Sequence, residues 1–178
     1  SRRGAQAEQS RETFDFRAAA ADEAAVLDNA AVNAVIVATR HDSHAGLAAR
    51  ALAAGKAVLV EKPLALSFEQ LNQVCAARQA APAGAFFQVG YNRRFAPLAI
   101  KLRDALAAKP GPKFVLIRVN AGALDPDAWA AGAAEGGGRI VGEACHFVDL
   151  ARFLVGQPIA HVFAEAAPPA RAAQPAED

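Results

Sequence analysis

The sequence has 178 residues, of which 53% are apolar, and a formal net charge of +1. This is enough apolar chain to bury the core of one domain, or of parts of two. The near-neutral charge gives no electrostatic footprint for nucleic acid, and no apolar stretch approaches the roughly 20 residues that cross a bilayer.

The first predicted elements are short. Residues 1–12 are polar and charged, and are expected to form a helix or to fray. The start Ser1-Arg2-Arg3 lacks the apolar segment of a signal peptide. A short edge strand is predicted at 13–16 (Thr-Phe-Asp-Phe), and a short helix from Asp22 to Asn29.

Three strand-helix units are predicted next. The β-branched run 34–39 predicts a strand that is buried on both faces. A helix follows, capped by Asp42 or Ser43 and closed by Gly55. The run 57–60 predicts the second strand.

A second helix is predicted to open with a capping box, Ser67 to Gln70, and to end at Pro82 and Gly84. One face of this helix carries four apolar side chains: Phe68, Leu71, Val74 and Cys75. The run 85–90 predicts the third strand. Strands that alternate with helices at this spacing predict right-handed crossovers and a parallel sheet.

The pattern changes near Asn92, where a domain boundary is predicted between residues 1–92 and residues 93–178. The second part is expected to begin with a helix (95–106), a turn (109–112) and an alternating strand (113–122), followed by a loop with Trp129 (124–138). A helix (143–154), a strand (159–164) and a disordered tail over the last dozen residues are expected to complete it. The alternating strand exposes one face, which would suit sheet-mediated dimerisation. Both cysteines, Cys75 and Cys145, are predicted to be buried free thiols, as expected in a reducing cytoplasm.

Polar residues follow each predicted strand, at 39–44, 61–63 and 91–94. In a parallel sheet the three strand ends share one edge, so these residues are expected to converge on one crevice. A desolvated lysine there, Lys62, could act as an acid or base near neutral pH. An ion pair of Lys62 with Glu61 is an equally good interpretation of the residues alone.

Other interpretations of these strand ends stay open. His41 and His44 could bind a metal, but a loop and first-turn histidine pair is favoured because no third ligand is close in sequence, so no metal site is predicted. Arg93 and Arg94 could bind a phosphate or carboxylate, or one of them could simply be solvated.

A second polar cluster follows the glycine run 136–138. Glu143, His146 and Asp149 are spaced by three residues, so they lie near one face of a helix. A carboxylate one turn away can orient the His146 ring and raise its pKa. A core-edge histidine with two solvated carboxylates is the alternative.

Taken together, these segments resemble the Gfo/Idh/MocA family of NAD(P)-dependent oxidoreductases. The matching pieces span about residues 13–160 and are, in order, Val35-Ile36-Val37-Ala38-Thr39 with His44, Ala54-Gly55-Lys56 with Glu61-Lys62-Pro63-Leu64, Val89 to Phe95, and Gly136-Gly137-Gly138 with His146 and Asp149. Two phrases, 38–42 and 142–147, look closest to a branch fused to zinc-type alcohol dehydrogenases.

The resemblance implies an α/β fold: a Rossmann-like parallel sheet, here truncated, followed by part of an α/β substrate domain with an open sheet. It implies hydride transfer between NAD or NADP and a sugar or polyol, with Lys62 and His146 as catalytic residues. The implied dinucleotide contacts are Ala38, Thr39, Arg40, His41, His44, Glu61, Lys62, Asn92 and Arg93, and the implied substrate contacts are Lys62, Glu143, His146 and Asp149. The implied partners are a small molecule and a second copy of the chain, with no nucleic acid and no membrane.

Two departures from the family bear on activity. The sequence has no G-x-G-x-x-G, so the first strand and the phosphate-binding turn are expected to be missing from a chain cut at both ends. The family's usual aspartate four residues before the histidine is Gly142 here, and whether Glu143 substitutes is open. The leading hypothesis is therefore an oxidoreductase that could be inactive as this fragment, and the rival hypothesis is a non-catalytic ligand-binding or assembly module of the same fold.

Overall fold

The structure is a computed structural model that describes residues 4–20, 22–122, 124–125 and 127–165. The predicted disordered tail lies outside these residues. Three strands form a parallel sheet in the order β1-β2-β3: β1 (Ala34–Val37), β2 (Ala57–Val60) and β3 (Phe87–Val89). The crossovers are α3 (His44–Ala53) and α4 (Phe68–Ala80). The α/β class, the parallel sheet and the three predicted strands are therefore confirmed.

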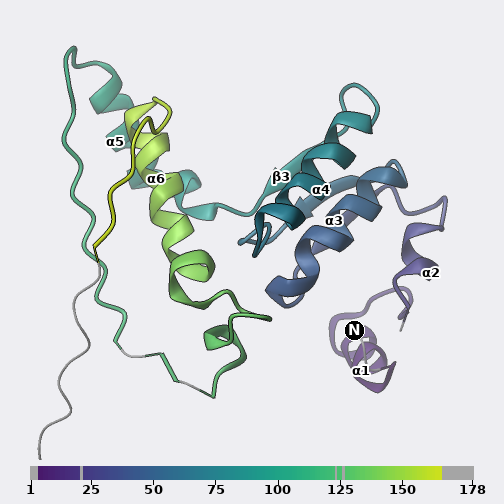
Figure 1. Ribbon diagram of the computed structural model, residues 1–178. Helices are drawn as coiled ribbons and strands as arrows, with labels where there is room; N and C mark the ends of the chain where they lie inside the picture. Colours follow the sequence, from purple (N-terminus) through teal and green to yellow (C-terminus); the bar gives the residue numbers. More distant parts are fainter. Residues whose placement is uncertain (1–3, 21, 123, 126, 166–178) are drawn as a thin grey trace, which may run out of the picture.

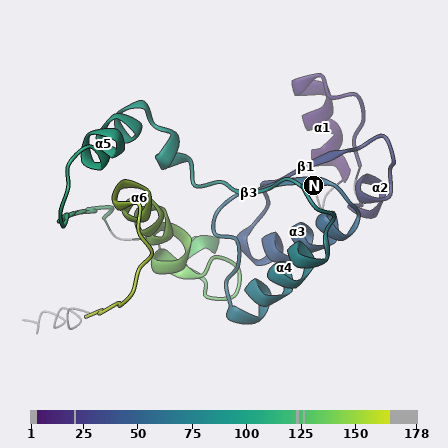
Figure 2. The ribbon, with the colours of Figure 1, turned by 90° about the horizontal axis from the view of Figure 1, so that it is seen from above.

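Both crossover helices pack on the same face of the sheet (Figures 1 and 2). The core there joins Val58 and Val60 of β2 to Leu52 of α3 and Val74 of α4. Burying each such side chain stabilises the fold by about 1.5–3 kcal/mol. This small core fixes the three strand ends relative to one another, which positions the site described below.

The prediction that the first strand is buried on both faces is wrong. Ile36 is 71% exposed while its neighbour Val37 is buried, because α3 and α4 both cover the same face. The apolar face predicted for α4 is also mostly exposed: Val74 is buried, but Phe68, Leu71 and Cys75 are not. Cys75 and Cys145 are free, yet Cys75 is exposed and Cys145 half-buried, so the prediction of buried thiols fails.

The helix caps predicted from the sequence are only partly observed. Ser67 Oγ accepts a hydrogen bond from the Gln70 amide at 3.2 Å, as in a capping box, but the Gln70 side chain accepts from the Leu66 amide instead of closing on Ser67. The predicted Asp42 or Ser43 cap of α3 does not form. The 3₁₀ turn His41–Ser43 runs directly into the helix, so Ser43 has helical backbone and its hydroxyl donates to the Arg40 carbonyl at 2.8 Å.

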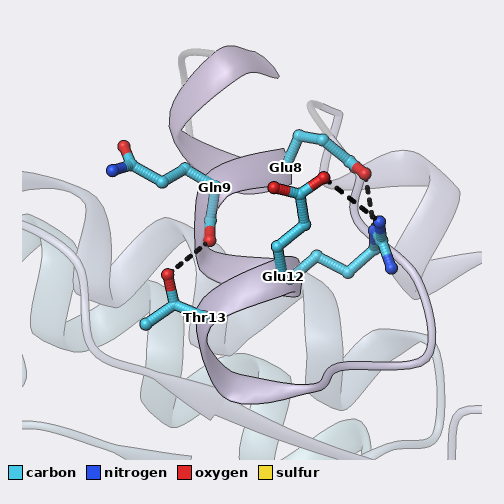
Figure 3. Close-up of polar contacts among 5 residues, drawn as sticks. Glu8, Gln9, Glu12 and Thr13 are labelled. Carbon is cyan, nitrogen blue, oxygen red and sulfur yellow. Dashed lines mark hydrogen bonds and ion pairs between the residues drawn. The ribbon is translucent and has the colours of Figure 1, made fainter.

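The N-terminal region is helical where an edge strand was predicted. Helix α1 (Gly4–Phe14) includes the first half of 13–16, and Figure 3 shows the local contacts that favour it. Thr13 Oγ1 donates to the Gln9 carbonyl at 2.8 Å, and Arg11 Nε lies 2.6 Å from a Glu8 oxygen. Contacts three and four residues apart stabilise a helix and are unavailable to a strand. Helix α2 (Ala24–Leu27) lies within the predicted 22–29.

The second half of the described chain contains helices and extended segments. After the 3₁₀ turn Asn92–Phe95, α5 (Pro97–Ala107) packs beside α6 (Cys145–Val155) (Figure 1). A 3₁₀ turn, Trp129–Ala131, and a π-helical turn, Ile140–Ala144, lead into α6. Gly156 ends α6 with a φ of +73°, the left-handed conformation expected of a C-cap glycine.

The strands predicted at 113–122 and 159–164 are absent. Both segments are extended but pair with no neighbouring strand in the described part of the chain, and Phe114 is 91% exposed. An alternating pattern gives a strand only when another strand satisfies its backbone groups. The open sheet expected in the second half is therefore not formed by the described residues, and dimerisation stays a prediction. No helix within the described ranges is long and apolar enough to cross a bilayer.

Candidate active site at the strand ends

Lys62 lies directly after β2 and points at the second half of the chain. Its Nζ donates a hydrogen bond of 2.8 Å to the Gly142 carbonyl, 80 residues away in sequence. The Glu61 carboxylate makes no ion pair with it; Glu61 Oε2 instead accepts from the Lys62 backbone amide at 3.3 Å. The Lys62-Pro63 peptide bond is cis. Lys62 is thus not held in the structural ion pair considered from the sequence.

His146, on the first turn of α6, lies close enough to Lys62 for their charges to interact. Its Nδ1 atom is buried and has no hydrogen-bond partner in the described residues. Burial lowers the pKa of His146, and the positive charges of Lys62 and Arg93 lower it further, outweighing the opposite effect of Glu61. Asp149, one turn away on α6, raises this pKa as expected of a carboxylate, but the net pKa of His146 is lowered. The result is a neutral imidazole near neutral pH beside a lysine.

The two carboxylates near His146 in sequence are bound elsewhere. Asp149, whose side chain is 9% exposed, takes two contacts from the Arg94 guanidinium, one of them Nε to Oδ2 at 2.9 Å. This hydrogen bonding raises the pKa of Arg94. Glu143 accepts from Arg139 at 3.1 Å. Arg94 is thus a structural anchor of α6 rather than a solvated arginine, and neither carboxylate orients the His146 ring.

His44 is 1% exposed at the start of α3. Its Nδ1 lies 2.8 Å from the Pro63 carbonyl oxygen and its Nε2 lies 2.9 Å from the Thr39 carbonyl oxygen. A carbonyl oxygen only accepts, so each contact is a hydrogen bond when the facing ring nitrogen carries hydrogen. Both nitrogens therefore face the protein backbone. The geometry makes His44 a cross-link between the ends of β1 and β2, and gives no support to a direct contact with a dinucleotide.

The turn after β1 contacts the loop that precedes α6 (Figure 1). Arg40 pairs with Glu135, and its guanidinium lies 5.5 Å from the centre of the Trp129 ring. His41 Nδ1 lies 2.8 Å from the Gly136 carbonyl oxygen. From the sequence, Trp129 was named only as a loop residue and Glu135 only as the start of the glycine-containing polar cluster; their contacts with Arg40 were not predicted.

The remaining predicted contacts lie at the same edge. Ala38, Thr39 and Asn92 are exposed, and the Thr39 and Ser43 hydroxyls share a hydrogen bond of 2.6 Å. The Glu61 carboxylate packs against Gly90 after β3: a Cβ added there would lie 3.0 Å from Oε2. Glycine at position 90 thus leaves room for Glu61.

Two residues after β3 approach the face of α6 near His146. The Arg93 guanidinium lies 4.6 Å from the centre of the Phe147 ring. The Tyr91 ring meets His146 edge-on, with ring centres 6.3 Å apart, and burial raises the pKa of Tyr91. This contact of Tyr91 with His146 was not predicted from the sequence.

A cavity of about 180 Å³ opens beside Lys62, lined by His41, Trp129, Gly142 and Glu143 among others. Such a volume can admit a small polar molecule. A larger cavity, about 280 Å³, lies between α2 and β1 and is lined mainly by apolar residues. Of these two cavities, the smaller one is lined by Lys62. The rings of His41 and His44 are 5.6 Å apart, but the described residues contain no cluster of three or more metal-binding side chains.

Comparison with known proteins identifies the family of this chain. The sequence profile of an oxidoreductase family with an NAD-binding Rossmann fold, GFO_IDH_MocA, matches residues 1–91, about half of the chain. The chain belongs to the Gfo/Idh/MocA oxidoreductase family. The family resemblance inferred from the sequence is therefore confirmed, whereas the branch fused to alcohol dehydrogenases stays a prediction.

Similar proteins include inositol dehydrogenases. Inositol 2-dehydrogenase 2 of Saccharopolyspora erythraea is 36% identical over 141 residues, which cover 78% of this chain and 39% of that protein. Inositol 2-dehydrogenase of Rhizobium meliloti is 33% identical over 156 residues, covering 87% and 43%. The scyllo-inositol 2-dehydrogenase (NAD(+)) of Bacillus subtilis is 30% identical over 140 residues, covering 77% and 39%. The chain thus spans about two fifths of these relatives.

Solved structures agree with this assignment. An oxidoreductase domain protein from Kribbella flavida has a TM-score of 0.75 at 29% identity, covering 88% of this chain and 43% of its own. Levoglucosan dehydrogenase in complex with NADH and levoglucosan also has a TM-score of 0.75, at 25% identity, covering 88% and 44%.

The strand ends fit one end of a dinucleotide. The crevice lies outside the carboxyl ends of parallel strands, where ligands bind in open α/β sheets. A neutral His146 with an unpartnered Nδ1, the Lys62 ammonium and the exposed Asn92 suit the nicotinamide end. No glycine-rich turn between a strand and a helix occurs in the parts of the chain that the structure describes, so these residues supply no pyrophosphate site.

Proposed function

We propose that this chain carries the catalytic strand-end residues of an NAD-dependent dehydrogenase that oxidises a secondary alcohol of a cyclic polyol or sugar. The observation that carries the proposal is the hydrogen bond of Lys62, from the end of β2, to Gly142 in the π-helical turn that leads into α6, the helix that holds His146. The names of the relatives, inositol 2-dehydrogenases and an NAD(+)-dependent scyllo-inositol dehydrogenase, support the polyol class and the choice of NAD.

In this proposal the two side chains have distinct roles. Lys62, which lines the cavity of about 180 Å³, donates a hydrogen bond to the substrate hydroxyl on the side of the lysine that faces His146. His146, neutral because its pKa is lowered, takes the hydroxyl proton as general base. Nicotinamide supplies the acceptor for the hydride that leaves the same carbon. Glu61, Asn92 and Arg93 are proposed to contact the dinucleotide, and Glu143 the substrate.

The test combines turnover with binding. The chain is mixed with NAD and a panel of inositols and sugars while NADH fluorescence is followed, and NADH binding is measured separately by calorimetry. Lys62→Met is expected to lower kcat at least about 100-fold while changing NADH affinity less than about threefold, because one hydrogen-bonding catalytic group is removed. Unchanged kcat in this variant would make Lys62 structural. Arg78→Met, on α4 away from the strand ends, is the matched control and is expected to behave like the unmodified chain.

One observation favours the non-catalytic alternative. His146 has no carboxylate partner, because Asp149 is bound to Arg94 and Glu143 to Arg139. A general base usually works best when a second group orients it. Saturable polyol binding without any NADH formation, unaffected by Lys62→Met, would support a ligand-binding module instead.

A further inference from the structure

His41 lies beside the residue that receives the Lys62 ammonium. A Cβ atom added to Gly142 would lie 3.4 Å from His41 Cε1 and 3.2 Å from the Gly136 carbonyl oxygen. A methyl group at position 142 would therefore touch the His41 ring. The space next to the Lys62 contact is filled by a side chain from the turn after β1 instead.

Two contacts fix the ring in this place. Nδ1 lies 2.8 Å from the Gly136 carbonyl oxygen, and because a carbonyl only accepts, Nδ1 carries the hydrogen. The ring also meets the Trp129 side chain edge-on, with centres 4.8 Å apart. Burial lowers the pKa of His41, and His44 and Lys62 lower it further. A neutral ring at this position adds no second positive charge beside the ammonium of Lys62.

The same short stretch of backbone thus has two partners. His41 binds the Gly136 carbonyl and packs against Gly142, while Lys62 donates to the Gly142 carbonyl at 2.8 Å. Both residues line the cavity of about 180 Å³. Displacement of the His41 ring would free the backbone that receives Lys62.

We propose that His41 is a positioning residue for Lys62, supporting the backbone of residues 136–142 from one side while the Gly142 carbonyl receives the ammonium on the other. The proposal rests on the function proposed above. It differs from the dinucleotide contact expected from the sequence. A positioning residue acts on kcat, whereas a cofactor contact acts on the KM for NAD.

The direct test uses the ¹³C carbonyl chemical shift of Gly142, measured by NMR in the full chain. Lys62→Met gives the shift that marks loss of the hydrogen bond. His41→Ala is expected to move the Gly142 signal at least halfway toward that value. His41→Asn, whose amide can still donate to Gly136, is expected to move it less. A Gly142 signal unchanged in His41→Ala but shifted in Lys62→Met would overturn the proposal. His161→Ala, at an exposed site outside the strand ends, is the control.

A second variant keeps the test decisive if His41→Ala does not fold. Gly142→Ala adds a methyl group at 3.2 Å from the Gly136 oxygen and 3.4 Å from His41 Cε1. The His41 ring signal and the Lys62 ammonium signal are expected to move together in this variant. Movement of the His41 signal alone would show that the two side chains are independent, and would overturn the proposal.

Kinetics separate this proposal from the proposed function. With turnover present, His41→Ala is expected to lower kcat about tenfold, the effect of a slightly misplaced catalytic group, with an unchanged KM for NAD. A raised KM for NAD with unchanged kcat would overturn the positioning role and support cofactor contact. If the chain shows no turnover at all, the proposed function fails, and the Gly142 signal still decides the question for His41.

Discussion

Replacing His44 by alanine tests whether the buried cross-link between strand ends stabilises the fold. The side chain is 1% exposed and contacts the Pro63 and Thr39 carbonyl oxygens at 2.8 and 2.9 Å. A neutral imidazole carries one N–H and a carbonyl oxygen only accepts, so one hydrogen bond is counted, and losing it costs about 1 kcal/mol in the free energy of unfolding. The empty space left by the ring adds about 2 kcal/mol. His44→Ala is therefore expected to lower the free energy of unfolding by about 3 kcal/mol.

The assay is urea-induced unfolding at neutral pH, followed by far-ultraviolet circular dichroism. His161→Ala, at an exposed histidine, is expected to change the free energy of unfolding by less than about 0.5 kcal/mol. His44→Gln keeps an amide that can donate to one carbonyl and should fall between the two. A loss below about 1 kcal/mol in His44→Ala would refute the reasoning, because it would mean that water or a shifted backbone satisfies both carbonyls at no net cost.

Three further outcomes are expected. The pKa values of His41 and His146 are lowered in the folded chain, so as the pH falls the unfolded chain takes up protons first; the contribution of the two histidines to the free energy of unfolding should be fully present above about pH 6.5 and be lost as the pH drops below it. Urea unfolding at several pH values should show this dependence of the free energy of unfolding on pH, and the variant His41→Gln/His146→Gln should reduce it. An equal dependence in both chains would contradict the assignment. Because Lys62 helps to lower the pKa of His146, Lys62→Met should raise the NMR titration midpoint of that ring, and a midpoint that stays put would place the two groups too far apart to interact. A double-mutant cycle of Arg94→Ala and Asp149→Ala should give a coupling of about 2 kcal/mol, between the values for exposed and buried pairs, since the Asp149 side chain is 9% exposed and that of Arg94 35%; a coupling near zero would show that the pair does not anchor α6.

Elements with strong local signals were predictable. The runs 34–39, 57–60 and 85–90 contain the three observed strands, and Gly55, predicted to close the first crossover helix, has the left-handed backbone of a C-cap glycine. These signals depend on residues that are consecutive in sequence, so they predict the local structure without knowledge of the tertiary contacts. The segments that failed needed partners: 113–122 has the alternation of a strand, but no described neighbour satisfies its backbone groups.

For the candidate site too, the positions of the residues could be predicted from the sequence, whereas their contacts could not. The position of Lys62 at a strand end follows from its place directly after a buried run, and parallel strands bring 39–44, 61–63 and 91–94 to one edge. The hydrogen-bond and ion-pair partners of the site residues could not be predicted from the sequence. The spacing of Glu143, His146 and Asp149 suggested a histidine oriented by a carboxylate, but Arg94 and Arg139 take both carboxylates.

The sequence by itself determined the parallel strand-helix-strand order, the edge at which polar residues gather, and the family, because these depend on local pattern and on the fixed direction of crossovers. Tertiary structure alone decided that Lys62 donates to Gly142, that His44 is a buried cross-link, and that His41 fills the space beside Gly142. These contacts join residues as much as about a hundred positions apart. Hydrogen-bond partners and pKa values are set by which groups meet in space, and sequence spacing does not encode that distance.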